Sequence, residues 1–232
     1  MTAGFRIQER QRKVSAEDVK LFAEIPVANI SDSMSRMTAA GPRLRPLHIG
    51  GKLAGAAITV KSRPGDNLMV HKALDLAEPG DIVVVDAGGD MSNAIIGELM
   101  VAHAIQRGLG GIVINGAVRD LAAIQAGTFP VFAAGVTHRG PYKDGPGEIN
   151  VPIAIDGMVI APGDLMVGDS DGLLCVPFDD LQAVYAAARK KNDAEAEQMA
   201  NIIAGRSDRS WVDASLQRLN CQIVTAVRPA NG

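Results

Sequence analysis

The stretch that most constrains this chain is the apolar run at residues 111–118, GIVINGAV, which is followed at once by Arg119 and Asp120. A run so rich in branched apolar residues predicts a buried strand. Arginine and aspartate are rarely buried without partners, so a strand that ends in both side by side indicates a functional site. The structural alternative is a surface ion pair in which Asp120 caps a following helix. Gly116 favours a site, because so small a residue lets backbone or ligand come close.

Strand and helix patterns alternate through the middle of the chain. Strands are expected at residues 55–60, 82–86, 111–118 and 131–135, and helices at residues 67–77, 94–107 and 121–126. The helical period predicts that the helix at 94–107 buries an apolar face made of Ile95, Leu99, Ala102, Ile105 and Leu109. Four short strands are expected after it, at residues 153–155, 158–160, 165–167 and 173–176.

The two ends of the chain differ from this middle part. Residues 1–15 are charged and are expected to form a loosely held arm, before a short helix capped by Ser15. Ser31 resembles a second helix start, and a long helix is expected from Asp179 to about Ala204. The Gly/Pro-rich segment at residues 137–152 is too long to be a simple connector. We therefore divide the chain into an arm and helix (1–24), a core (25–178), and a C-terminal helix and tail (179–232).

Composition excludes several classes of function. The formal net charge is −3 with no long basic run, so binding to nucleic-acid phosphates is not expected. The N-terminus lacks an apolar signal region, and no stretch approaches the roughly 20 apolar residues of a membrane span. We expect a cytoplasmic protein that binds neither nucleic acid nor membranes. Its two cysteines, Cys175 and Cys221, are expected to be reduced and structural.

A second segment adds to the site at Arg119 and Asp120. Gly97, Glu98, Leu99 and Met100 lie about twenty residues upstream, near the start of a helical pattern. Backbone amides at such a start can bind an anionic group, although the helix dipole alone also favours a glutamate there. An arginine fork can hold a carboxylate or a developing enolate, and an aspartate can hold a hard metal ion. Together these residues predict a metal-assisted site for a small 2-oxo acid.

The choice of metal follows from what the sequence lacks. The four histidines show no H-x-x-x-H spacing and the two cysteines no C-x-x-C spacing, so a zinc site is not expected. Oxygen ligands supplemented by water suit Mg²⁺ or Mn²⁺ instead.

Two other chemistries have weaker support. The segment at residues 83–90, VVVDAGGD, superficially resembles the first motif of methyl-donor-dependent methyltransferases, but its spaced third glycine is missing. A Schiff-base aldolase would need a lysine in apolar surroundings, and Lys61 is the only plausible candidate. The neighbours of Lys61, Ser62 and Arg63, suit the exposed end of a strand.

Three motifs, taken in order, resemble a known family. They are GELM followed by GLGGIVINGAVRD, then FPVFAAG, and then APGDLMVGDSDGLLCVP. On these motifs the chain is identified as a member of the RraA-like family between about Ile25 and Ala204. That family contains the regulator of ribonuclease activity A. It also contains class II pyruvate aldolases acting on 4-hydroxy-4-methyl-2-oxoglutarate and 4-carboxy-4-hydroxy-2-oxoadipate.

The resemblance carries expectations about fold and assembly. It implies an α/β fold, a swivelling β/β/α sandwich with helical extensions at both ends, assembled as homotrimers or hexamers. Active sites would lie between subunits, with Glu195 from the C-terminal helix of a neighbour, or Glu197 if the register slips.

The family resemblance also implies a mechanism. Asp120 would hold Mg²⁺ or Mn²⁺, and the amides of Gly97 to Met100 would bind the substrate carboxylate. Arg119 would stabilise the enolate, while Glu98 or Glu195 would help to remove the C4 hydroxyl proton. Oxaloacetate decarboxylation is expected as a side activity, since it forms the same enolate. The alternatives are a non-catalytic regulator that binds a ribonuclease and, with least support, a methyltransferase.

Overall fold

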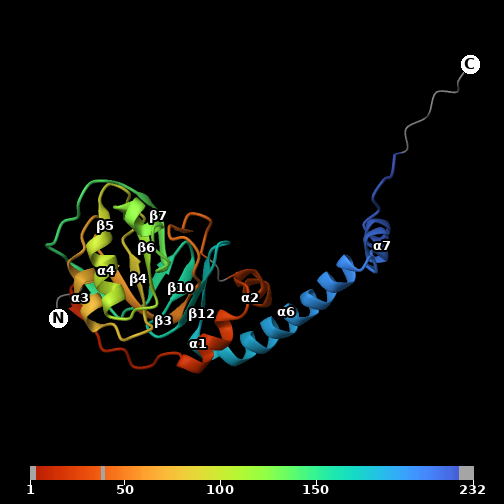
Figure 1. Ribbon diagram of the computed structural model, residues 1–232, viewed down its shortest axis with the longest axis horizontal. Coiled ribbons are helices and arrows are strands. Elements are labelled where there is room, and N and C mark those ends of the chain that lie inside the picture. Colours follow the sequence, from red (N-terminus) through yellow and green to blue (C-terminus); the bar gives the residue numbers. More distant parts are fainter. Residues whose placement is uncertain (1–3, 38–39, 225–232) are drawn as a thin grey trace, which may run out of the picture. The chain divides into compact units, whose positions relative to one another are not determined.

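The protein is described by a computed structural model that covers residues 4–37 and 40–224 (Figure 1). The described part of the chain divides into two compact units, with the boundary after Asn192. The second unit contains the end of α6 (Leu181–Ile203) and α7 (Ser210–Arg218). None of the helices in the described ranges is long and apolar enough to cross a lipid bilayer.

The first unit is built around a sheet with the strand order β1-β8-β3-β4-β6-β7-β2. Its centre is parallel and consists of β3 (Leu53–Ser62), β4 (Ile82–Asp86), β6 (Gly111–Val118) and β7 (Val131–Val136). The short strand β5 (Ala94–Ile96) pairs in parallel with the end of β6. At the edges, β8 (Gly147–Ile149) and β2 (Arg45–Pro46) run antiparallel to β3 and β7, and β1 (Arg6–Ile7) pairs with β8.

A second β layer packs on one face of this sheet. It contains β11 (Leu165–Gly168), which pairs with β3 and with β12 (Leu173–Val176), and the hairpin of β9 (Ile153–Ile155) and β10 (Met158–Ile160). On this side also lie α1 (Ala16–Ala23), α2 (Val27–Ser33) and the first turns of α6. Figure 1 shows α3 (Leu68–Leu76) and α4 (Glu98–Gln106) on the opposite face, where α5 (Leu121–Gln125) also contributes to the core.

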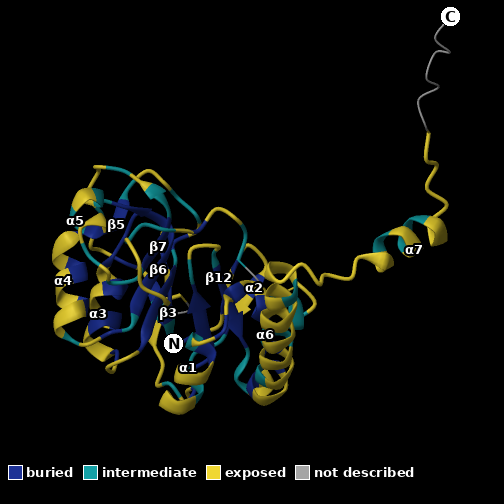
Figure 2. Ribbon diagram, turned by 45° about the vertical axis from the view of Figure 1, so that its right-hand side comes forward, coloured by how far each residue is buried: buried dark blue, intermediate teal, exposed yellow. Residues whose placement is uncertain are grey.

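The alternation of side chains along β4 explains the two cores. Ile82 and Val84 pack into the core of the β layer, whereas Val83 and Val85 pack against the helices. All four are fully buried, so the parallel strands are covered on both faces, as Figure 2 shows by their dark blue colour. The result is the β/β/α architecture that the family resemblance implied.

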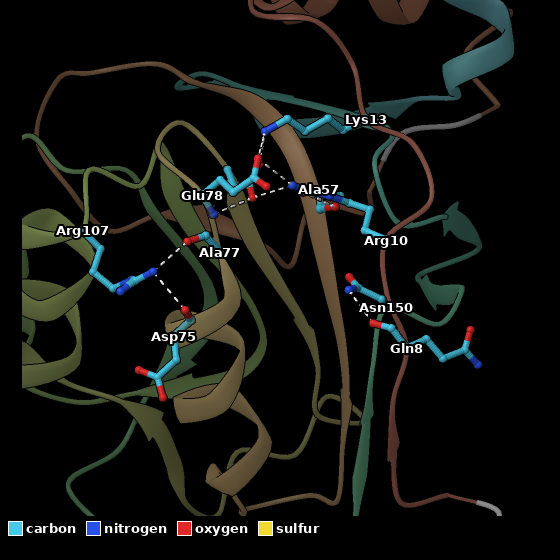
Figure 3. A network of polar contacts seen from close by, with 10 residues as sticks. Gln8, Arg10, Lys13, Ala57, Asp75, Ala77, Glu78, Arg107 and Asn150 are labelled. Atoms are coloured by element: carbon cyan, nitrogen blue, oxygen red, sulfur yellow. Dashed lines mark hydrogen bonds and ion pairs between the residues drawn. The ribbon is translucent and has the colours of Figure 1, made fainter.

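Residues 4–15 of the N-terminal arm are tied to the core, contrary to the expectation of a loose segment, whereas residues 1–3 lie outside the described residues. Besides the β1–β8 pairing, the Arg10 guanidinium lies 2.9 Å from the buried carboxylate of Asp81. Lys13 forms an ion pair with Glu78, as Figure 3 shows. In the same view Arg107 donates to the last carbonyls of α3. The arm's charges therefore meet partners that are distant in sequence.

Two expectations about the helix predicted at residues 94–107 were also wrong. Residues 94–96 form a strand rather than the first turn of α4, and Gly97 separates the two elements. The side chains that α4 buries are Met100, Val101 and Ala104, while the predicted face is exposed at Leu99 and Ile105.

The starts of two other helices also differ. Ser31 lies inside α2, which begins after Pro26, where the Val27 amide donates a hydrogen bond to the Asp169 carboxylate at 3.0 Å. Asp179 lies in a short 3₁₀ turn, η1 (Phe178–Asp180), just before α6. In contrast, Ser15 caps α1 as predicted, because its side chain accepts a hydrogen bond from the Asp18 amide. Cys175 is buried, as expected of a structural thiol, whereas Cys221 is exposed.

Candidate functional site

A cavity of about 250 Å³ opens at the carboxyl edge of the parallel strands. It lies among the end of β5, the first turns of α3 and α4, and the loop of residues 137–146. In open α/β sheets this edge is where ligands bind. The lining residues include three basic side chains, those of His71, Arg119 and Lys143, and no acidic one. The cavity therefore favours an anion.

Arg119 and Asp120 reach this edge because β6 ends just before them. Arg119 lines the cavity, and its Nε lies 3.7 Å from Asp120 Oδ2. The backbone of Asp120 is left-handed, with φ +59° and ψ +40°. Aspartate tolerates this region better than most residues, and such strained positions cluster at functional sites.

The conformation of Asp120 decides which helix its side chain caps. No side-chain cap forms with α5, the helix that Asp120 precedes. Instead its Oδ2 accepts a hydrogen bond from the Glu98 amide, the first residue of α4, at 2.9 Å. The Asp120 side chain therefore does not cap the following helix, which was the structural alternative raised by the sequence.

Gly97 makes this approach possible. A Cβ atom at this position would lie 2.3 Å from Asp120 Oδ2 and 2.8 Å from Arg119 Cγ. Its φ of −152° is open to any residue, so the requirement for glycine is steric. Gly116 has a related but milder role, because its Cβ would lie 3.3 Å from the Asp90 carbonyl oxygen.

The start of α4 offers fewer free amides than the sequence suggested. The Glu98 amide is taken by Asp120, and the Met100 amide donates to the Gly97 carbonyl at 3.1 Å. The Leu99 amide has no acceptor in the described part of the chain. It is the best-placed donor at this helix start for an anionic group in the cavity.

The opposite wall of the cavity was missed by sequence reasoning. It is formed by Asn67 and His71 of α3 and its cap, with Pro141 and Lys143 of the loop. Burial lowers the pKa of His71, the nearby Lys143 ammonium lowers it further, and the Asp75 carboxylate opposes this. The unusual length of the loop was the only sequence signal that pointed to this wall.

The remaining predicted residues occupy different places. Glu98 is exposed beside the cavity but does not line it. Glu195 and Glu197 belong to the part of α6 in the second unit. Their expected place at a neighbour's site is therefore still a prediction.

The side chains that could bind a metal ion suit a site in which water supplies most of the ligands. Within the described ranges, no group of three or more His, Cys, Asp or Glu side chains is arranged to hold an ion. The Asp120 carboxylate uses one oxygen for the Glu98 amide, and its side chain is 41% exposed. A single exposed carboxylate fits Mg²⁺ or Mn²⁺ that keeps mostly water ligands, and it does not fit a closed zinc site.

The fold and the site together define an α/β protein with a cationic cavity at the carboxyl edge of its parallel strands. Residues 27–175 match the family model described as "RraA-like: Aldolase/RraA", so the chain belongs to the RraA-like family. This confirms the resemblance carried by the sequence motifs.

Individual relatives agree with this assignment. A Halalkalibacterium halodurans protein named "Putative 4-hydroxy-4-methyl-2-oxoglutarate aldolase" is 41% identical over 190 residues, covering 80% of this chain and 90% of the relative. An uncharacterized Pseudomonas syringae pv. tomato protein superposes with a TM-score of 0.76 at 25% identity, covering 83% of this chain and 95% of the other. The RNA-processing inhibitor RraA from Thermus thermophilus superposes with a TM-score of 0.61 at 29% identity, covering 66% and 92%.

Proposed function

We propose that the protein is a divalent-metal-dependent aldolase that cleaves a 4-hydroxy-2-oxo acid and releases pyruvate. The substrate is of the 4-hydroxy-4-methyl-2-oxoglutarate or 4-carboxy-4-hydroxy-2-oxoadipate type, and oxaloacetate decarboxylation is a side activity. The observation that carries the proposal is the position of Arg119 in a cavity with basic but no acidic lining side chains, with Asp120 at its edge. The name of the Halalkalibacterium halodurans relative supports the same reaction class.

The residues of the cavity suggest how the substrate is held. The Leu99 amide at the start of α4 binds the C1 carboxylate, helped by the positive end of the helix dipole. The Arg119 guanidinium then faces the 2-oxo group, where its planar fork donates two hydrogen bonds. Asp120 would hold Mg²⁺ or Mn²⁺, which supplies Lewis-acid stabilisation of the negative charge on the substrate when bound.

Cleavage requires proton removal and charge stabilisation. A base takes the proton of the C4 hydroxyl, the C3–C4 bond breaks, and C4 becomes a carbonyl. The bonding electron pair passes to the pyruvate enolate, which Arg119 stabilises and which is then protonated at C3. In the proposed mechanism Glu98, or Glu195 of a neighbouring subunit in a homotrimer or hexamer, orients the proton acceptor.

The test is a coupled assay of pyruvate release from both aldols and from oxaloacetate, with lactate dehydrogenase as the reporter. Activity should require Mg²⁺ or Mn²⁺ and should disappear with EDTA. Full activity after thorough chelation would contradict the metal mechanism. Asp120→Asn should keep the fold yet lose turnover, because an amide oxygen could still accept the hydrogen bond from Glu98 but carries no charge for the metal.

Arg119→Lys separates catalysis from packing. A lysine keeps the charge but cannot form two parallel hydrogen bonds, so turnover should fall while the melting temperature changes little. Near-normal turnover would make Arg119 a partner in a surface ion pair only.

A non-catalytic regulator is the alternative, supported by the similarity to the Thermus thermophilus RNA-processing inhibitor. Such a protein would inhibit a ribonuclease through a surface patch and would keep that activity in Asp120→Asn. Ribonuclease inhibition without pyruvate release from any of the three substrates would favour it.

A further inference from the structure

We propose that the loop of residues 137–146 supplies, through Lys143, a subsite for a second carboxylate of the substrate, and that Asp66 is the positioning residue that fixes this loop. The inference rests on the proposed function and deepens it. It assigns the discrimination between dicarboxylic and monocarboxylic 2-oxo acids to residues on the wall opposite α4.

The loop runs past both sides of the cavity. At its start the Thr137 amide donates to the Val118 carbonyl, next to Arg119. A Cβ at Gly140 would lie 3.3 Å from Arg119 Nη1, so this part of the loop lies close to the guanidinium. Lys143 follows three residues later and lines the same cavity. Three residues span at most about 11 Å, so the two cations can face the two ends of one small acid.

Asp66 anchors the far end of the loop to α3. Its side chain is fully buried, and its Oδ2 accepts hydrogen bonds from the Asp144 and Gly145 amides at 2.8 Å and 2.9 Å. Its Oδ1 accepts from the Leu68 amide, also at 2.9 Å. Hydrogen bonds to a charged acceptor are stronger than neutral ones, so the backbone next to Lys143 is fixed to the start of α3.

Two backbone contacts reinforce the anchor. The Tyr142 amide donates to the Gly65 carbonyl at 2.8 Å, and the Asn67 amide donates to the Tyr142 carbonyl at 3.0 Å. Lys143 therefore lies between a paired residue and two residues bound by Asp66. Its backbone is held while its side chain stays exposed.

The charge of Lys143 has no partner that would explain it structurally. Across the described ranges, Lys143 forms no ion pair with a carboxylate, although it lines a cavity that also contains Arg119. Like charges gathered at one cavity cost stability unless an anion binds there. Arg119 and the Leu99 amide already account for the 2-oxo acid end of the substrate. A second carboxylate on the substrate would be the partner of the Lys143 ammonium.

The experiment compares ligands that differ only at the distal group. Binding of 2-oxoglutarate and 2-oxopentanoate, which carries a methyl group in place of the second carboxylate, is measured by calorimetry with the full chain and Mg²⁺. The wild-type protein should prefer 2-oxoglutarate, and Lys143→Met should weaken only this ligand, by about 10- to 100-fold, the range of one charge-assisted hydrogen bond. Lys72→Met, which removes the same charge from α3 outside the cavity, should change neither affinity.

Asp66 is tested through its coupling to Lys143. Asp66→Asn replaces an acceptor oxygen by a donor and should weaken 2-oxoglutarate binding while leaving 2-oxopentanoate binding unchanged. In a Lys143→Met background it should have no further effect, because the loop then has nothing to position. Equal losses for both ligands in either background would mean that Asp66 only maintains the fold.

Failure of this proposal can be told from failure of the proposed function. Equal affinity of the wild-type protein for both ligands would overturn the subsite, even if aldols are cleaved. If the protein prefers 2-oxoglutarate through Lys143 but releases no pyruvate from any substrate, the subsite is supported and the proposed aldolase activity is contradicted. Where cleavage occurs, kcat/KM for 4-hydroxy-4-methyl-2-oxoglutarate should fall in Lys143→Met, whereas that for 4-hydroxy-2-oxopentanoate should not.

Discussion

The Oδ2 atom of Asp120 accepts a hydrogen bond from the backbone amide of Glu98 at 2.9 Å, so a residue that follows β6 caps the helix that follows β5. This contact joins the two segments that the sequence singled out. It also fixes the carboxylate through a single oxygen. In the aldolase mechanism the other oxygen is the one that would face the metal.

Gly97→Ala should damage the site far more than the fold. The new methyl group would lie 2.3 Å from Asp120 Oδ2, so Asp120 and Arg119 would have to move. A displacement of about 1 Å can reduce turnover roughly 100-fold, while such overpacking costs about 1–3 kcal/mol of stability. Pyruvate release and the melting temperature measure the two effects.

Gly127→Ala is the matched control for this substitution. Its Cβ would meet nothing closer than the Ile124 carbonyl at 3.8 Å, so both activity and stability should be preserved. Normal turnover of Gly97→Ala would show that the close approach of Asp120 is unimportant.

The ion pair of the N-terminal arm should contribute strongly to stability. The side chains of Arg10 and Asp81 are 11% and 2% exposed, so Arg10→Met leaves a buried carboxylate without its main partner. We expect a loss of about 2–3 kcal/mol in the free energy of unfolding, measured by urea denaturation. Arg36→Met breaks an exposed pair with Asp32 and should cost clearly less stability than Arg10→Met, because solvent screens exposed charges. Equal effects would mean that the buried Arg10–Asp81 pair contributes no more to stability than an exposed ion pair.

The sequence predicted the central strands and the part of the site around Arg119 because those features are local. Branched apolar runs predicted β4 and β6 directly, and the residues after β6 indicated the site. The wall containing His71 and Lys143 could not be predicted, since it depends on how a long loop folds back onto α3. The buried face of α4 was also mispredicted, because Leu99 and Ile105 follow the helical period yet are exposed. Periodicity cannot say which of two apolar faces meets the sheet.

His71 should titrate below its ordinary value of 6.5, because burial and the Lys143 ammonium both disfavour its charged form. NMR titration of the imidazole measures this directly. In Lys143→Met the pKa of His71 should rise, while Asp75 and His103 continue to act on it. A value at or above 6.5 in the wild-type protein would contradict the proximity of Lys143.

The same shift has a consequence for stability. With a lower pKa in the folded state, His71 binds protons more readily in the unfolded chain. Stability therefore rises with pH between the folded value and about 6.5, and is lost as pH falls through the folded value. Lys143→Met should flatten this dependence in denaturation curves recorded at several pH values.

Complementation between two inactive variants should show whether Glu195 acts on a neighbouring subunit. Asp120→Ala and Glu195→Ala should each lose pyruvate release. In the proposed cyclic assembly, each site takes Asp120 from one chain and Glu195 from the next. After dissociation and random reassembly of an equal mixture, about one site in four contains both wild-type residues, so activity should return to roughly that fraction. Glu197→Ala mixed with Asp120→Ala tests the alternative register. If activity does not return although subunit exchange is verified by mass spectrometry, each site is built within a single chain.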